Sequence, residues 1–248
     1  MGAGSRALIL GRVEDVAVVW HPAGLRAMTA GEGRLTRHSL SFGAHYDPGN
    51  VAFGELVAHN DDRLEPGGGY PDHPHVDVEI VTWVLEGVLA HRDSLGGAAD
   101  LGPGTVQVQS AGSGVRHSEI ADPGAGPTRF VQAWIRPDQP GGTPQRELAE
   151  SAPTPGAGLV PLVAGVGAAP LRLRARRATL WAARLEAGEE VALPGDRRQH
   201  LFVAFGGVLL PTADVRAGEG DAVRLVDEPG LRLAASAPTE LLVWGFAD

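Results

Sequence analysis

The chain has 248 residues, a formal net charge of −9 and 43% hydrophobic residues. This length suffices for one large domain or two ordinary ones, and the acidic balance argues against a sequence-independent grip on nucleic acid, which requires many basic side chains. The absence of cysteine excludes disulfides and thiolate ligands, is consistent with a cytoplasmic protein, and restricts any metal to nitrogen and oxygen ligands. No apolar stretch approaches the length of a membrane span.

Short strand patterns, separated by glycine and proline turns, run along most of the sequence. Residues 7–20 alternate loosely and predict strands, and further strands are predicted over 76–85, 88–92, 105–109, 115–120 and 130–135. Residues 136–158 are rich in proline and glycine and are interpreted as an interdomain connection, with a short helix around residues 145–150. Strand patterns resume over 171–177, 180–185, 201–205, 208–210, 222–226 and 241–244. The spacing predicts antiparallel barrels or jelly rolls.

Two short motifs carry the candidate chemistry. His73 and His75 lie two residues apart in a stretch with strand character, and a strand turns both imidazoles to one face. His117 and Glu119 repeat this spacing in a second predicted strand. Three nitrogens and one carboxylate oxygen would converge, a set that suits divalent Fe, Mn, Ni, Cu, Co or Zn without selecting among them.

Each candidate residue also has a structural interpretation. The three histidines can be hydrogen-bonded core or turn residues, and Glu119 can be a surface carboxylate, although the double pairing favours a metal. Glu79 falls on the face of His75 by strand parity, so it is a ligand, a group behind the ligands or a structural residue. The remaining histidines of this half have no neighbour that completes a ligand pair and are interpreted as structural: His38, His45, His59 and His91.

A weak internal repeat links the two halves. LEPG at 64–67 recurs as LEAG at 185–188, and PGTV at 103–106 has a counterpart in GDAV at 220–223. The repeat predicts two copies of one barrel, over residues 1–140 and 141–248. Aligned in this way, the C-terminal counterparts of the four candidate ligands are Pro194, Asp196, Leu233 and Ala235. The second copy is therefore predicted to hold no metal.

The first motif resembles the first metal motif of the cupins, because Gly67 is followed after five residues by His-Pro-His and then by Glu79. More narrowly, HPHVDVEIVTWVLEGVLAHRDSLG with GPGTVQVQSAGSGVRHSE resembles the pirin family, over about the N-terminal half. The resemblance implies an all-β bicupin of two antiparallel barrels, with one metal, most often iron(II), in the first. It also implies which residues hold that metal: His73, His75, His117 and Glu119. Ala121 stands where cupins in general have an asparagine, which loosens the inference from cupins at large but not from pirins.

The resemblance further implies a metal-dependent dioxygenase that opens a flavonol such as quercetin with O₂. Glu119 would act there as a ligand or as the base that accepts the flavonol hydroxyl proton. The alternative is a non-enzymatic, metal-dependent or redox-sensing regulatory partner of another protein, and a third hypothesis is a different cupin reaction on another metabolite. We expect a cytoplasmic monomer that takes a small aromatic substrate, without direct binding to nucleic acid or membrane.

Overall fold

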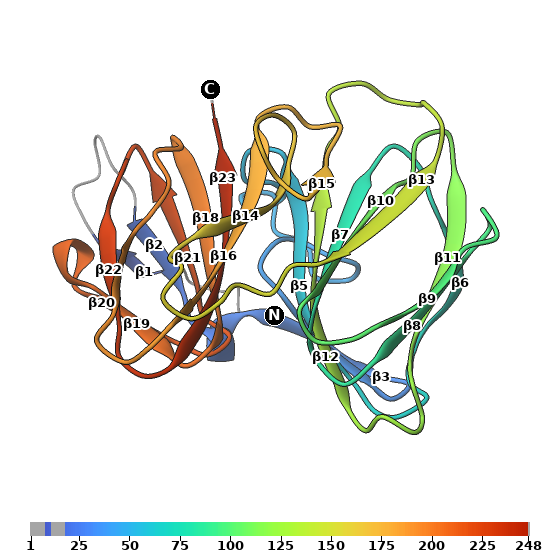
Figure 1. Ribbon diagram of the computed structural model, residues 1–248, viewed down its shortest axis with the longest axis horizontal. Helices are drawn as coiled ribbons and strands as arrows, with labels where there is room; N and C mark the ends of the chain where they lie inside the picture. Colours follow the sequence, from blue (N-terminus) through green and yellow to red (C-terminus); the bar gives the residue numbers. More distant parts are fainter. Residues whose placement is uncertain (1–7, 11–17, 248) are drawn as a thin grey trace. The chain divides into compact units, whose positions relative to one another are not determined.

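Antiparallel strands make up nearly all of the regular structure in the computed structural model (Figure 1). The structure describes residues 8–10 and 18–247, so the predicted strand character of residues 11–17 lies outside the described part. Only two short 3₁₀ helices, Ala23–Leu25 and Pro211–Ala213, occur in the described part. This confirms the predicted all-β class. No helix within these residues is long and apolar enough to cross a membrane.

The chain divides into two compact units. We call Ala27–Ala152 with Pro170–Arg176 the N-terminal barrel, and the remaining described residues the C-terminal barrel. The sequence placed the division after residue 140, whereas the contacts place it after residue 152 because β13 (Gln145–Glu150) pairs residue by residue with β10 (Thr105–Ser110). The helix predicted around residues 145–150 is therefore wrong. Likewise β2 (Val18–His21) belongs to the C-terminal barrel because it pairs with β21 (Ala222–Val226).

The N-terminal barrel consists of a seven-stranded sheet, β13-β10-β7-β12-β5-β4-β3, and a four-stranded sheet, β6-β11-β8-β9. Its other strands are β3 (Ala27–Gly31), β4 (Arg34–His38), β5 (Leu56–Leu64), β6 (Gly69–His75), β7 (Glu79–Glu86), β8 (Leu89–Asp93), β9 (Ala98–Leu101), β11 (Val115–Ala121) and β12 (Thr128–Ile135). A buried apolar cluster, including Leu64, Val84, Leu89 and Phe130, contains residues from both sheets. The candidate ligands lie on β6 and β11 of the small sheet.

The C-terminal barrel has its large sheet in the order β1-β2-β21-β18-β23-β16-β14 and a small sheet, β17-β22-β19-β20. Its strands are β1 (Leu8–Leu10), β14 (Val160–Ala164), β16 (Ala178–Leu185), β17 (Glu190–Ala192), β18 (Arg198–Phe205), β19 (Gly207–Leu210), β20 (Val215–Gly218), β22 (Arg232–Ala235) and β23 (Thr239–Phe246). One apolar core, which includes Leu201, Val223, Leu233 and Val243, fills its interior. The strand predicted over 171–177, a segment that begins within the N-terminal barrel, is confined to β15 (Leu171–Arg172).

The two barrels share the same turn geometry, which confirms the internal repeat. Gly87 has φ +71°, and Thr128 Oγ1 accepts from the backbone N–H of Val88 and donates to its carbonyl. Gly206 has φ +76°, and Thr239 Oγ1 forms the same two bonds with Gly207. A β-carbon on either glycine would lie within 2.6 Å of a backbone or side-chain oxygen, so both turns require glycine.

The repeat also corrects the alignment that the sequence suggested. Gly67 N–H bonds to the carbonyl of Ala121, and Gly188 N–H bonds to that of Ala235, so Ala235 corresponds to Ala121 and not to Glu119. The counterparts of His117 and Glu119 are therefore two residues earlier, at Leu231 and Leu233. Both are buried in the apolar core, so the expected absence of these two ligand types from the second copy is unchanged.

Candidate metal centre

Strands β6 and β11 bring three histidines to one face. His117 pairs with His73, but Glu119 pairs with Tyr70, so β6 carries one more residue than β11 between these pairs. This β-bulge is absent from the C-terminal barrel, where three successive residues of β17 pair with three of β22. The corresponding stretch continues with Leu193 N–H bonded to the Leu231 carbonyl, so Leu193 takes the place of His73.

The three imidazoles are close enough to share one ion. The Nε2 atoms of His73 and His117 are 3.1 Å apart, and the ring centroids of His75 lie 4.8 Å from those of His73 and His117. One ligand atom from each of the three residues lies within 4.8 Å of the others. Two nitrogens that bind one ion at about 2.1 Å and at right angles are about 3.0 Å apart, which matches the observed separation.

Hydrogen bonds and burial keep these imidazoles ready to donate electron pairs. His73 Nδ1 donates to the Pro71 carbonyl at 2.8 Å, which leaves the lone pair on Nε2. His75 Nε2 is buried and has no hydrogen-bond partner among the described residues. Burial, and then the neighbouring His73, lowers the pKa of His75 to about 4, and the same causes lower that of His117 to about 2. An orphaned buried nitrogen beside two further imidazoles fits a metal ion.

Glu119 lies beside His117 but deeper in the barrel. Its ligand atom forms a second close group with those of His91 and His117, and is not part of the group of three histidines. The side chain is 1% exposed, and Gln132 Nε2 contacts both carboxylate oxygens at 2.9 and 2.8 Å. Burial raises the pKa of Glu119 to about 7, and the nearby Asp62 carboxylate adds to the rise. Glu119 is therefore a carboxyl group poised to exchange a proton near neutral pH.

His91 belongs to this interior cluster, although the sequence interpretation set it aside as structural. Its ring lies 5.2 Å from that of His117. Nε2 donates to Asp93 Oδ2 at 3.2 Å, and Nδ1 accepts from Gln107 Nε2 at 3.3 Å. Both ring nitrogens are thus engaged, and His91 supports the site rather than offering a free ligand atom. The feature that places His91 in the site is its register, because His91 of β8 pairs directly with Glu119 of β11.

Glu79 faces away from the site. Asp77, with φ +53°, sits in the turn between β6 and β7 and resets the parity that placed Glu79 on the face of His75. The Glu79 carboxylate instead accepts from Ser110 Oγ at 2.7 Å and from the Arg174 backbone N–H at 3.2 Å. It is a buried structural group, and the ligand interpretation of Glu79 is wrong.

A pocket of about 460 Å³ opens beside His73 and His75. Val57, Val76 and Trp134 form apolar walls, and the Trp134 ring meets the His75 ring edge-on at 4.9 Å. Gln132 fixes this tryptophan by accepting from its Nε1 at 3.1 Å, so the same amide side chain holds both Trp134 and Glu119. The pocket therefore offers a small, planar, mostly apolar molecule a route to the histidines.

Comparison with known proteins identifies the relatives of this chain. The sequence model of the Pirin family matches residues 23–135. A Mycobacterium tuberculosis protein provisionally named as a quercetin 2,3-dioxygenase is 44% identical over 224 residues, which cover 88% of this chain and 91% of that protein. The chain belongs to the pirin family. The quercetin 2,3-dioxygenase of Escherichia coli K12 is 32% identical over 217 residues, 84% of this chain and 89% of that enzyme.

A solved structure shows the same fold. The Escherichia coli bacterial pirin YhhW, crystallised in complex with nickel(II), superposes with a TM-score of 0.84 at 29% identity, over 93% of this chain and 99% of that one. This similarity agrees with the bicupin architecture inferred from the internal repeat.

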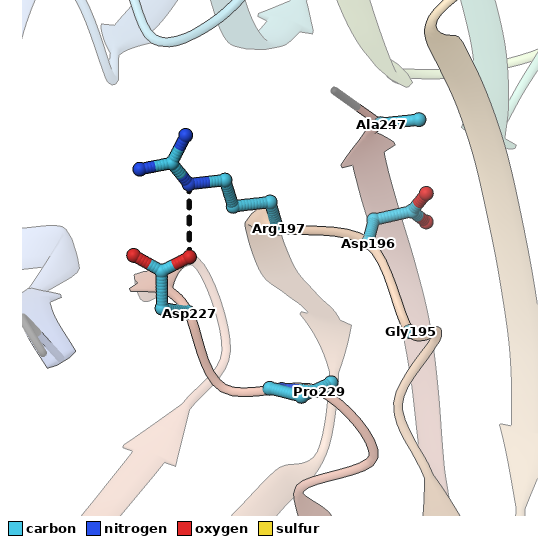
Figure 2. Close-up of a pocket in the computed structure, with 6 residues that line it drawn as sticks. All are labelled: Gly195, Asp196, Arg197, Asp227, Pro229 and Ala247. Carbon is cyan, nitrogen blue, oxygen red and sulfur yellow. Dashed lines mark hydrogen bonds and ion pairs between the residues drawn. The ribbon is translucent and has the colours of Figure 1, made fainter.

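The C-terminal barrel of this pirin also has a pocket, whose lining residues are drawn in Figure 2. It is lined by Gly195, Asp196, Arg197, Asp227, Pro229 and Ala247, without an imidazole. Arg197 Nε donates to Asp227 Oδ1 at 2.9 Å, while the Asp196 carboxylate points away from that pair. In the described part of the chain, the only clusters of three metal-binding side chains lie in the N-terminal barrel.

Proposed function

We propose that this pirin is a metal-dependent dioxygenase that opens a flavonol such as quercetin with O₂, releasing carbon monoxide. The observation that carries the proposal is the convergence of three imidazoles next to an apolar pocket walled by Trp134. His73, His75 and His117 would hold a divalent metal, which the family resemblance gives as iron(II), and Glu119 would be the fourth ligand or the base. Mn, Ni, Cu, Co and Zn suit the same donor set, and the names of the relatives support the substrate class.

The side chains of the site would have separate roles in the reaction. When bound, the metal would supply Lewis acidity for the flavonol hydroxyl and the redox chemistry that O₂ requires. The apolar walls at Val57, Val76 and Trp134 exclude water from the ring that is opened. Glu119, whose pKa is near 7, accepts the hydroxyl proton, and Gln132 orients the carboxylate through its Nε2.

The first test is quercetin consumption in air, with carbon monoxide as the measured product. Purified protein is loaded separately with Fe(II), Mn(II), Ni(II), Cu(II) and Co(II), and His117→Ala serves as the control. We expect carbon monoxide release that depends on both the metal and His117. Stoichiometric metal binding without carbon monoxide from any loaded form would refute the proposed reaction while leaving the metal site in place.

A second candidate function is a metal-dependent regulatory partner of another protein. It is favoured by the position of His75 between Pro74 and Val76, both exposed, with Val76 61% accessible. Binding of a metal through His75 would fix this surface segment and so change what a partner protein meets. A partner whose affinity is the same for metal-loaded and metal-free protein would argue against this function.

A further inference from the structure

The large sheet of the N-terminal barrel carries a row of side chains at the level of the histidines. Gln109 of β10 pairs with Ile80 of β7, which in turn pairs with Trp134 of β12. Directly paired residues on neighbouring strands project to the same face of a sheet. Ile80 and Trp134 belong to one interior cluster, and the Trp134 ring lies 4.9 Å from that of His75.

Gln109 therefore faces the barrel interior. Gln107, two residues earlier on the same strand, confirms this direction because its carboxamide meets His91 Nδ1 inside the barrel. The Gln109 side chain is fully buried, with 0% exposure. Gln109 thus shares an inward-facing row with Trp134, whose ring adjoins that of His75.

The carboxamide of Gln109 has no partner. Neither Nε2 nor Oε1 forms a hydrogen bond with any residue that the structure describes. The amides around it are bonded: Gln107 contacts His91 and accepts from Arg146 Nη1 at 3.2 Å, and Gln132 holds Glu119. A buried amide that lacks both its donor and its acceptor contact destabilises a fold. The presence of glutamine at position 109 therefore requires an explanation other than stability.

The C-terminal barrel shows that the fold does not need an amide there. The Gly104 N–H bond to the Val84 carbonyl recurs as the Gly220 N–H bond to the Val203 carbonyl, which aligns the strands. In this alignment Leu225 replaces Gln109, and Gln199 replaces Ile80. Leu225 packs in the apolar core, and Gln199 Nε2 donates to the carbonyls of Pro194 and Asp196 at 2.9 and 3.1 Å. In the C-terminal barrel, the equivalent row therefore has an apolar side chain at one position and, at the next, an amide whose Nε2 is hydrogen-bonded to the neighbouring loop.

We propose that Gln109 is a ligand-binding residue, whose carboxamide donates one hydrogen bond to the molecule held at His73, His75 and His117 and accepts one from it. This inference rests on the proposed function of that site. A donor and an acceptor on one planar amide edge match a ligand with the complementary pair on adjacent ring atoms. The substrate class is therefore a ring that carries a hydroxyl beside a carbonyl, or two neighbouring hydroxyls.

The test compares stability with affinity in the full-length protein. Gln109→Met removes the amide but keeps an unbranched side chain, and Gln109→Leu introduces the side chain that the C-terminal barrel uses. Gln199→Met is the matched control, a buried glutamine in the equivalent row whose Nε2 is bonded to two carbonyls, although its Oε1 has no partner among the described residues. We expect both Gln109 variants to raise the unfolding midpoint of the ligand-free protein by about 2 °C or more, and Gln199→Met to lower it.

Affinity is measured under argon with metal-loaded protein, by titration calorimetry with quercetin, catechol and 3-hydroxy-4-pyranone as probes. We expect the Gln109 variants to bind a probe about tenfold more weakly or worse, and Gln199→Met to bind it like the wild type. Unchanged affinity, or Gln109 variants no more stable than the wild type, would overturn the inference. Wild type that binds catechol or the pyranone but not quercetin would refute the flavonol proposal alone, and Gln109 is then judged with the probe that binds. If no probe binds, the inference about Gln109 is judged by the unfolding midpoints of the variants.

Discussion

Glu119→Gln tests the chemistry of the centre most directly, because it removes the ionisable group and keeps the shape. Burial places the pKa of Glu119 near 7 in the metal-free protein, against 4.5 for an ordinary glutamate. Since one pKa unit corresponds to about 1.4 kcal/mol, ionising Glu119 in the folded protein costs about 3 kcal/mol more than ionising an exposed glutamate. A metal that binds the carboxylate has to displace this proton at any pH below 7.

Metal affinity should therefore depend on pH in a way that Glu119→Gln abolishes. Below pH 7 the wild type should lose about tenfold in affinity per pH unit on account of Glu119, or about 100-fold between pH 7 and pH 5. His75 and His117 add little to this slope because their pKa values, about 4 and about 2, leave them neutral over the interval. Glu119→Gln should bind more weakly at pH 8 but with a shallower slope below pH 7.

The assay is competition with a chelator of known proton affinity, from pH 5 to pH 8, on both proteins. The difference between the two slopes isolates Glu119 from every other titrating group. Unfolding of the metal-free proteins gives a second readout. A raised folded-state pKa favours the folded state below pH 4.5, and this contribution of about 3 kcal/mol is lost as the pH rises through 7. Equal slopes for wild type and Glu119→Gln would refute the assignment of the proton to Glu119.

Three further changes test the site and the fold. His75→Ala should abolish stoichiometric metal binding, measured by metal analysis after dialysis, because it removes one of three converging imidazoles. Asp61→Asn should lower the free energy of unfolding by about 3–5 kcal/mol in urea titrations, since it leaves the buried guanidinium of Arg129, bonded through Nε at 2.9 Å, without its carboxylate. Gly87→Ala should lower the unfolding free energy by more than about 2 kcal/mol, because its β-carbon would lie 2.6 Å from Thr128 Oγ1 at a φ of +71°.

Each of these changes has a matched control. His45→Ala replaces a histidine outside both clusters of metal-binding side chains and should leave metal stoichiometry intact. Glu190→Gln removes a surface carboxylate that is paired with Arg232 at 3.1 Å. It should lower the free energy of unfolding by less than about 1 kcal/mol. Gly96→Ala, at φ +82° but with nothing within 4 Å, measures backbone strain alone. A control as damaging as its partner would contradict the corresponding argument.

The sequence predicted the ligand cluster because two residue pairs at strand spacing are visible without a structure. The same parity failed for Glu79, since Asp77 introduces a left-handed turn that no periodicity announces. Helix propensity failed for residues 145–150, whose good helix formers form β13 because β10 offers an open edge. Local preference is weaker than a complete ladder of hydrogen bonds.

The remainder of the site depends on pairings between distant strands. His91 is a supporting residue only because Gln107 and Asp93 engage both its nitrogens, and Gln107 comes from another strand. Gln109 follows two residues later in the alternating sequence Val-Gln-Val-Gln, which shows that both amides share a face but not that one is bonded and the other is not. Whether each amide is bonded depends on which strands pair and in which register, and neither can be inferred from the local sequence.

The two barrels together show what the polar interior is for. In the N-terminal barrel the middle of the interior is polar: Asp62, Thr82, Gln107, Glu119 and Gln132. The paired strands and turns align these with apolar residues of the C-terminal core: Ala183, Leu201, Val223, Leu233 and Val243. The same fold is therefore built with an apolar interior, so folding does not require the polar layer. Burying two carboxyl groups and two amides weakens the N-terminal barrel relative to such a core. That cost is understandable only if the layer serves the ligands of the histidine cluster, and it predicts that metal-free protein opens first at β6 and β11, as backbone hydrogen exchange would show.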